Sequence, residues 1–113
     1  VEHLNPFKLA YLHVVENFGE ATSDGFDFTA LRKIFNGAYM ANGGYTAELA
    51  EQSLESDKSD FIAFGTDFIS NPDLPQRIRL GAQLNEADPS TYYGGDAKGY
   101  TDYPSLEDES ALA

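Results

Sequence analysis

The chain has 113 residues, of which 42% are hydrophobic and 13% aromatic, which allows one folded domain with a modest core and argues against a disordered chain. Nineteen Asp and Glu against seven Lys and Arg give a formal net charge of −12, which argues against nucleic acid and anionic lipid as partners. The sequence contains no Cys, which excludes disulfides, thiolate metal sites and a cysteine nucleophile.

The first part of the chain predicts a strand followed by a helix. The apolar run from Leu9 to Val15 is short and ends in β-branched residues, as buried strands do. A polar stretch from Glu16 to Asp27 follows. Apolar residues then recur at helical spacing from Phe28 to Phe35, and Asn36-Gly37 ends this helix. We interpret His13 as a hydrogen-bonded core residue of the strand, because no second His lies at the spacing of a metal site.

The same order repeats in the middle of the chain. A short strand is predicted from Ala38 to Ala41, and a tight turn from Asn42 to Gly44. Thr46 is the expected N-cap of a helix, because its hydroxyl can accept from the N–H groups of the first turn. The helix itself is predicted from Ala47 to Ser56, a segment rich in Ala, Glu and Leu.

A third strand and a further helix follow. The strand is predicted from Phe61 to Phe64, with a short helical turn beginning near Phe68. The next helix is predicted from Leu74 to Leu80, capped by Asn71 or Asp73 and stiffened at its entry by proline.

After Gly81 the composition changes, and we expect an ordered tail without long elements, frayed from Glu107 to Ala113. Gly94 to Gly99 (GGDAKG) lacks the Gly-Lys-Ser/Thr ending of a phosphate loop, so it is a weak signal. The tail is anchored by aromatic side chains, which we expect to pack or to donate to a substrate oxygen: Tyr92, Tyr93, Tyr100 and Tyr103.

The alternation of strand and helix predicts an α/β fold with parallel strands and right-handed crossovers. Three parallel strands leave two edges open, so self-association is one way for such a chain to cover them.

Two glycine-containing loops are candidates for a phosphate site. Asn42, Gly43 and Gly44 follow one predicted strand, and Gly65-Thr66 follows the next. Glycine lets a main chain approach a ligand closely, and in (β/α)8 barrels a phosphate often lies at this position. The alternative is that these glycines only permit tight turns.

The sequence resembles the old yellow enzyme family of flavin-dependent ene-reductases, in the branch of the N-ethylmaleimide, pentaerythritol tetranitrate and oxophytodienoate reductases. The resemblance covers nearly the whole chain and is most specific in its second half. The matching segments are Tyr11 to Glu16, Ala41 to Thr46, Asp60 to Gly65, Phe68 to Leu74, Leu84-Asn85, Thr91 to Tyr93 and Gly99 to Pro104.

This resemblance implies that residues 1–113 are the C-terminal portion, about strands 6 to 8 with their helices, of a (β/α)8 TIM barrel that binds FMN. NAD(P)H would reduce the flavin, which would pass hydride to the β-carbon of an activated alkene or nitro substrate. The proton-donating tyrosine and the His/His or His/Asn pair that holds the substrate lie upstream in the family. The resemblance therefore implies no catalytic residue in this chain, and the residues themselves indicate no metal ligand.

Residue by residue, Gly43, Gly44 and Gly65 match positions whose amides hold the FMN phosphate, and Asn42 flanks them. Thr66 departs from the family, which usually has arginine there, and this loss of charge predicts weaker FMN binding.

One further aromatic residue and two rival hypotheses complete the sequence-based prediction. Tyr93 matches a tyrosine that contacts the substrate. The rivals to the enzyme are a partial barrel that dimerises and binds a phosphate or flavin without turnover, and an inactive truncated product. No apolar run can span a bilayer and Val1 to Pro6 do not resemble a signal peptide, so we expect a cytoplasmic protein without a membrane partner.

Overall fold

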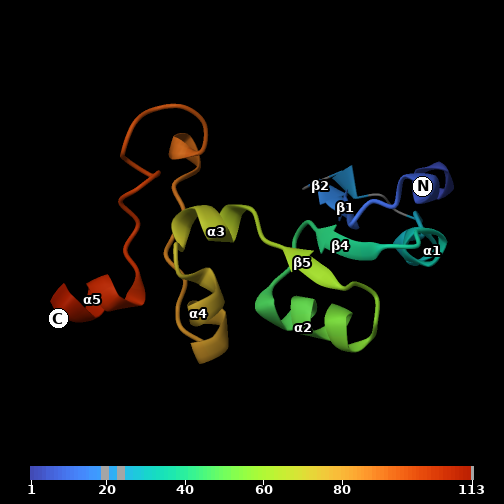
Figure 1. The fold of residues 1–113 in the computed structure, drawn as a ribbon. Coiled ribbons are helices and arrows are strands. Elements are labelled where there is room, and N and C mark those ends of the chain that lie inside the picture. The colour runs from blue at the N-terminus through green and yellow to red at the C-terminus, as the bar shows by residue number, and fades with distance from the viewer. Residues whose placement is uncertain (19–20, 23–24, 113) are drawn as a thin grey trace. The chain divides into compact units, whose positions relative to one another are not determined.

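A parallel sheet organises the first of two units into which the chain divides, Val1–Phe64 and Gly65–Ala113 (Figure 1). The computed structural model describes residues 1–18, 21–22 and 25–112. The sheet has the strand order β1-β4-β5, and both neighbouring pairs are parallel. The α/β class and the parallel pairing are therefore as the sequence predicts.

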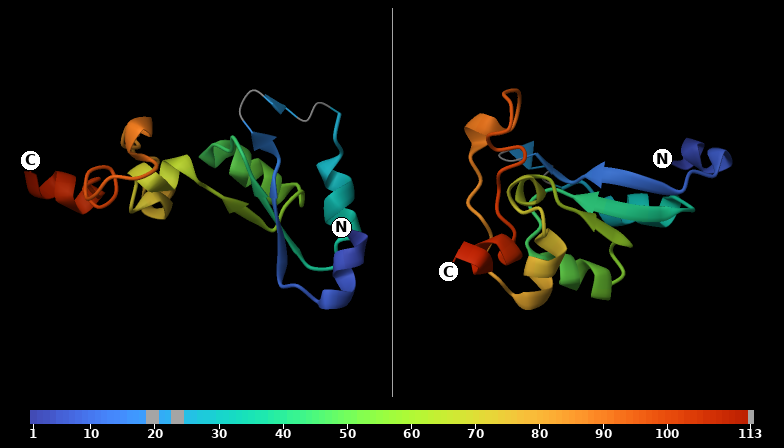
Figure 2. Two further views of the ribbon diagram at one scale, coloured as in Figure 1. Left: turned by 90° about the horizontal axis from the view of Figure 1, so that it is seen from above. Right: turned by 60° about the vertical axis from the view of Figure 1, so that its left-hand side comes forward.

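The strands and helices of the first unit lie within a few residues of their predicted positions (Figure 2). The predicted strands extend slightly too far at Leu9 and at Phe64, which lie outside the pairing. The elements of this alternating order are β1 (Tyr11–Val15), α1 (Phe28–Ile34), β4 (Ala38–Asn42), α2 (Ala47–Glu55) and β5 (Phe61–Ala63).

Side chains alternate between the two faces of this sheet. On one face Tyr39 and Ala41 are 1% and 0% exposed, in register with the half-buried Leu12 and Val14. The opposite face carries Tyr11 and Phe61, which are 52% and 51% exposed. His13 belongs to this second face and is also exposed, so its prediction as a core residue is wrong. Only one face of the sheet is therefore packed within the described part of the chain.

Caps and ion pairs fix the helices of the first unit. The Asp27 carboxylate accepts from the Ala30 N–H at 3.1 Å, and the predicted cap Thr46 accepts from the Leu49 N–H at 3.2 Å. Arg32 of α1 donates to the carboxylate of Asp60 at 2.7 and 2.9 Å. It also pairs with Asp57, so α1 is tied to the segment that leads into β5.

Three short elements of the first unit are not predicted from the sequence. A 3₁₀ helix, η1 (Glu2–Phe7), precedes β1. The stretch predicted as polar and without regular structure contains β2 (Asn17–Phe18) and β3 (Ala21–Thr22), which pair antiparallel. Residues 19–20 and 23–24 of that stretch lie outside the described residues. Strands of two residues are too short to produce a recognisable alternation.

The second unit contains the short helix α3 (Thr66–Ser70), then α4 (Leu74–Leu80), the 3₁₀ turn η2 (Pro89–Thr91) and α5 (Leu106–Leu112). The α4 boundaries agree with the predicted helix. The predicted frayed end from Glu107 is wrong, because residues up to Leu112 are helical; Ala113 lies outside the described residues.

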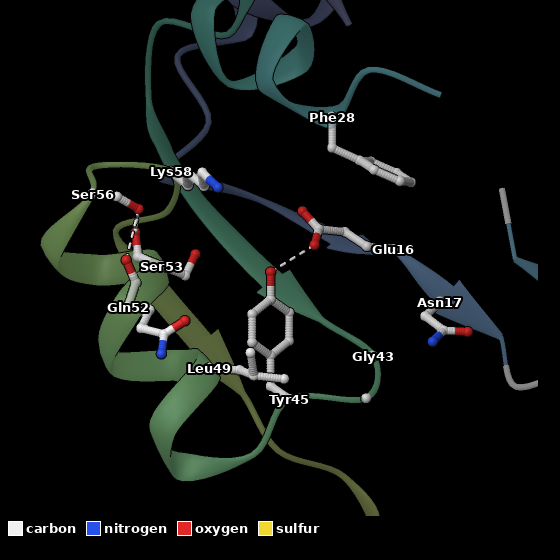
Figure 3. A pocket seen from close by; sticks show the side chains of 11 residues that line it. Glu16, Asn17, Phe28, Gly43, Tyr45, Leu49, Gln52, Ser53, Ser56 and Lys58 are labelled. Atoms are coloured by element: carbon white, nitrogen blue, oxygen red, sulfur yellow. Dashed lines mark hydrogen bonds between the residues drawn. The ribbon is translucent and has the colours of Figure 1, made fainter. Parts of the chain in front are cut away.

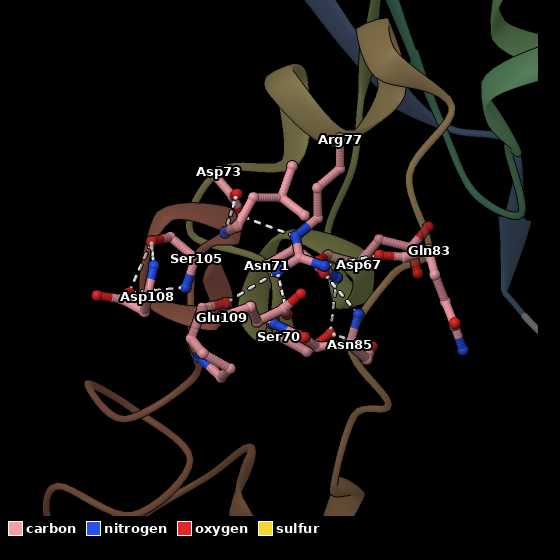
Figure 4. Close-up of polar contacts among 12 residues, drawn as sticks. Asp67, Ser70, Asn71, Asp73, Arg77, Gln83, Asn85, Ser105, Asp108 and Glu109 are labelled. Atoms are coloured by element: carbon pink, nitrogen blue, oxygen red, sulfur yellow. Dashed lines mark hydrogen bonds and ion pairs between the residues drawn. The ribbon is translucent and has the colours of Figure 1, made fainter. Parts of the chain in front are cut away.

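A buried arginine connects the elements of this second unit (Figure 4). Arg77 is 1% exposed, and its guanidinium donates to Asp73 and Glu109, both at 2.8 Å. It also donates to the carbonyl oxygens of Gln83 at 2.6 Å and Pro104 at 3.0 Å. Because a buried charge is costly unless it is paired, these contacts hold the tail against α4.

Asp73 occupies the predicted N-cap position of α4, but its side chain makes no capping bond there. It accepts instead from Arg77 and from the Leu106 N–H at 2.8 Å. The alternative predicted cap, Asn71, is buried and donates to the carbonyl oxygen of Asp67 at 2.8 Å. Its Oδ1 atom accepts from the Asn85 N–H at 2.8 Å, so both predicted caps serve contacts between distant segments. None of the helices in the described ranges is both long and apolar enough to cross a membrane.

The uncovered sheet face predicts that the isolated chain is marginally stable and self-associates. Exposed apolar patches of this kind favour association, and β1 and β5 each have one neighbour in the sheet. Phe61→Thr should weaken association at little cost to the fold, because Phe61 is half exposed. Sedimentation velocity and thermal unfolding at several concentrations measure both effects. A concentration-independent, cooperative transition of a monomer would contradict this prediction.

Candidate functional site

The end of β4 and the turn after it contain three of the predicted site residues. Gly43 and Gly44 have φ angles of +110° and +71°, a region that side-chain-bearing residues rarely adopt. A Cβ on Gly43 would lie 2.7 Å from both the N and O atoms of Asn17. Glycine is therefore required here by conformation and by the close main chain. Asn42, the last residue of β4, has its Nδ2 atom 3.1 Å from Nε2 of His13.

A carboxylate with two phenols lies beside this turn, and Figure 3 shows it with one of them, Tyr45. Glu16, directly after β1, accepts from the Tyr39 hydroxyl through Oε1 at 2.8 Å and from the Tyr45 hydroxyl through Oε2 at 2.7 Å. Its own N–H donates to the carbonyl oxygen of Asn42 at 2.8 Å. Main-chain and side-chain bonds of one residue thus reach both sides of the turn.

Burial and this carboxylate make both phenols weaker acids. Burial first, and then the hydrogen bond to Glu16, raise the pKa of Tyr45 to about 12. The same two causes, in the same order, raise the pKa of Tyr39 further. Both phenols therefore remain protonated donors to Glu16 at neutral pH.

A cavity of about 610 Å³ opens in front of this group, within the first unit. Figure 3 shows Glu16 and Tyr45 at its wall, beside the side chains of α2. Among the lining residues are Asn17, Phe28, Gly43 and Lys58.

The second glycine loop begins the second unit. Gly65 is the N-cap of α3 with a φ of −95°, and a Cβ added to it would meet no heavy atom of the described residues within 4 Å. Neither the φ angle nor packing requires glycine here, in contrast to Gly43. Thr66 is the first residue of α3 and is exposed. Tyr93 lies in the loop after η2 and is 94% exposed.

The predicted site residues thus lie in three separate segments of the chain. Asn42, Gly43 and Gly44 form one turn, Gly65 and Thr66 are consecutive, and Tyr93 lies in a separate loop. Among residues 1–18, 21–22 and 25–112, no cluster of three or more His, Asp or Glu could hold a metal ion.

Sequence reasoning missed Glu16, Tyr39 and Tyr45 as a group. A signal was present in the strand alternation, because Leu12, Val14 and Glu16 fall on one face of β1 and its extension. A carboxylate at the end of an otherwise apolar face needs polar partners, and two tyrosines flank the next turn.

The chain is similar to enzymes of known structure and to plant reductases. No family model matches it. It is 38% identical to 12-oxophytodienoate reductase 2 of Arabidopsis thaliana over 95% of this chain and 30% of that protein. It superposes on morphinone reductase with a TM-score of 0.86 at 43% identity, over 96% of this chain and 30% of that one. The old yellow enzyme from Trypanosoma cruzi gives a TM-score of 0.85 at 37% identity, over 93% and 28%.

These matches and the parallel strand–helix order define the chain as part of a (β/α)8 barrel. It spans about 30% of the length of the curated relatives that it matches. The chain corresponds to the C-terminal part of an old yellow enzyme family protein, as the sequence motifs indicate.

The raised pKa of Tyr45 predicts a loss of stability in alkaline solution. Between pH 10 and about 12, the phenol is ionised in the unfolded chain but still protonated in the folded one. The unfolded state then binds fewer protons, so the contribution of this phenol is complete below pH 10 and is lost as the pH rises to about 12.

Tyr45→Phe should therefore make the free energy of unfolding fall less steeply over this pH range, as measured by urea unfolding at each pH. Tyr93→Phe is the matched control, because it removes an exposed phenol that lies outside the Glu16 group. Equal slopes for the two variants would show that the Tyr45 phenol is not held by Glu16 in solution.

Proposed function

We propose that this chain is the C-terminal part of a cytoplasmic, FMN-dependent NAD(P)H oxidoreductase that reduces activated alkenes such as enones, maleimides and nitro compounds. The observation that carries the proposal is the similarity of nearly the whole chain to 12-oxophytodienoate and morphinone reductases. One of the matched morphinone reductase structures is a complex with tetrahydroNAD, which supports a nicotinamide as the reductant.

The residues present fit a flavin phosphate. Gly43 and Gly44 form a turn of positive φ, in which main-chain N–H groups can face an anion. At Gly65 no described atom lies within 4 Å of an added Cβ, so this glycine leaves room for a ligand where folding does not demand it. We propose that these three amides, flanked by Asn42 and helped by the N–H and hydroxyl of Thr66, hold the FMN phosphate in the complete barrel.

The contribution of this chain to the reaction is binding and positioning. FMN, when bound, supplies hydride transfer from NAD(P)H to the β-carbon of the alkene. The exposed side chain of Tyr93 is available to contact the substrate. In the family, the proton donor and the pair that holds the substrate oxygen lie upstream of the matched segment, so proton transfer belongs to the rest of the barrel.

The isolated chain should not reduce cyclohexenone or N-ethylmaleimide with NAD(P)H and FMN. General acid catalysis and stabilisation of the substrate oxygen each contribute on the order of 100-fold or more, and both would be missing. A complete barrel carrying residues 1–113, natural or made by replacing the matching part of morphinone reductase, should be active. Anaerobic NAD(P)H oxidation coupled to alkene loss measures both proteins. Turnover by the isolated chain above free FMN, or a flavin-loaded complete barrel without turnover, would contradict the proposal.

Thr66→Arg in the complete barrel should tighten FMN binding. A charge-assisted hydrogen bond to a phosphate contributes roughly 1.5–3 kcal/mol, and a neutral hydroxyl about half of that. Ordering the longer side chain offsets part of the gain. We expect about a tenfold lower dissociation constant at low salt, with a smaller gain as the salt concentration rises.

Fluorescence quenching during FMN titration of the apoprotein measures this change. Thr66→Gln is the matched control, because it lengthens the side chain without adding charge. Equal affinities of the wild type and Thr66→Arg at low ionic strength would show that Thr66 is no defect, and that residues elsewhere in the barrel compensate for it.

A further inference from the structure

We propose that Glu16 is a positioning residue that fixes the turn from Asn42 to Tyr45 in the conformation that receives the flavin phosphate. This inference rests on the proposed function and assigns to Glu16 a role that the similarity to the reductases does not specify. Its basis is the set of contacts that surround the turn inside the first unit, of which Figure 3 shows the bond between Glu16 and Tyr45.

The carboxylate of Glu16 connects β4 to the end of the turn. Tyr39 lies on β4, three residues before Asn42, and Tyr45 is the last residue of the turn. Both hydroxyls donate to the same carboxylate, one to each oxygen, at 2.8 and 2.7 Å. A single charged group therefore links the strand that leads into the turn to the residue that ends it.

The main chain beside Glu16 sets the inner side of the turn. The Glu16 N–H donates to the carbonyl oxygen of Asn42 at 2.8 Å, which continues the β1–β4 pairing beyond the strand. The next residue, Asn17, has its N and O atoms 2.7 Å from the position that a Gly43 Cβ would occupy. Its Nδ2 atom lies 3.2 Å from the corresponding position at Gly44. A shift of residues 16–17 would therefore remove the close contacts that restrict the conformation of both glycines.

The direction of the Gly43 and Gly44 amides follows from these contacts. Gly43 and Gly44 both have positive φ and could adopt many other backbone conformations, since glycine is the least restricted residue. An anion site made of amides binds well only when its N–H groups already point at one place, because reorienting them on binding costs free energy. Glu16 supplies that preorganisation without touching the phosphate.

The test compares FMN with riboflavin, which has the same ring system and no phosphate. In the complete barrel, Glu16→Gln keeps the size of the side chain but turns an N–H2 group toward one of the two phenols. With one charge-assisted hydrogen bond lost, we expect about tenfold weaker FMN binding and an unchanged riboflavin affinity. Tyr45→Phe should change the FMN-to-riboflavin ratio in the same direction by a smaller factor, and it serves where Glu16→Gln does not fold.

Asp60→Asn is the matched control. Asp60 is also a carboxylate that holds Tyr39, since it accepts from the Tyr39 N–H at 2.7 Å, but it acts at the start of β4 and pairs with Arg32. Its loss should lower the melting temperature and leave the ratio of the two flavin affinities unchanged.

Each outcome either supports or overturns the positioning role of Glu16. A lower ratio in Glu16→Gln and Tyr45→Phe, but not in Asp60→Asn, supports the inference. Equal losses for both flavins in Glu16→Gln would show a purely structural role, and a wild-type preference for FMN that Glu16→Gln preserves would overturn this inference alone. A wild-type barrel that binds FMN no better than riboflavin would overturn it together with the proposed phosphate site.

Discussion

The close approach of two main-chain segments, the one leaving β1 and the one leaving β4, determines the candidate site of the first unit. Parallel pairing makes this approach unavoidable, because the carboxyl ends of both strands reach the same edge of the sheet. At Gly43 the space left by Asn17 is too small for any side chain. The positive φ angles and the placement of Glu16 opposite two phenols are consequences of that crowding. The glycines are thus explained first by folding, and any ligand site there uses a turn that the fold already needs.

The second unit depends on a different interaction, a buried charge. Few large apolar side chains of this unit are buried among the described residues, Leu74 at 1% exposed being one, whereas Arg77 is equally buried. The hydrogen bond to Glu109, followed by that to Asp73, raises the pKa of Arg77, so the guanidinium stays charged and demands its partners. The amide of Leu106, and then Arg77, lower the pKa of Asp73. Removing Arg77, Asp73 or Glu109 would leave a charged partner without one of its ion pairs. This polar cluster therefore orders the tail, which has few buried apolar side chains to do so.

Local sequence patterns predict local structure but not contacts between residues far apart in the sequence. This difference separates the correct predictions from the wrong ones. The helices α1 and α2 follow from apolar spacing and a capping hydroxyl, all within one segment, and they are found almost at the expected bounds. Asp73 is misassigned as a cap because its partner at Leu106 is 33 positions away. The helix α5 does carry a local signal, since Ser105 and Asp108 form the reciprocal bonds of a capping box, yet its position at the end of the chain predicts fraying. His13 was misplaced because burial depends on which face of the sheet is covered, which a single strand does not reveal.

The acidity of the chain makes the geometry of the turn more important for the proposed phosphate site. A net charge of −12 opposes the binding of a phosphate, and Thr66 provides no cation where the family has arginine. Attraction from the turn itself then comes from N–H dipoles, whose field falls off faster with distance than that of a charge and which are effective only when well aligned. In the proposed site, that alignment comes from the contacts of Glu16 with Tyr45 and of Asn17 with Gly43. A phosphate-binding loop of this kind on an acidic chain would depend on geometry, and we propose that a carboxylate unfavourable beside the phosphate acts instead by fixing the turn.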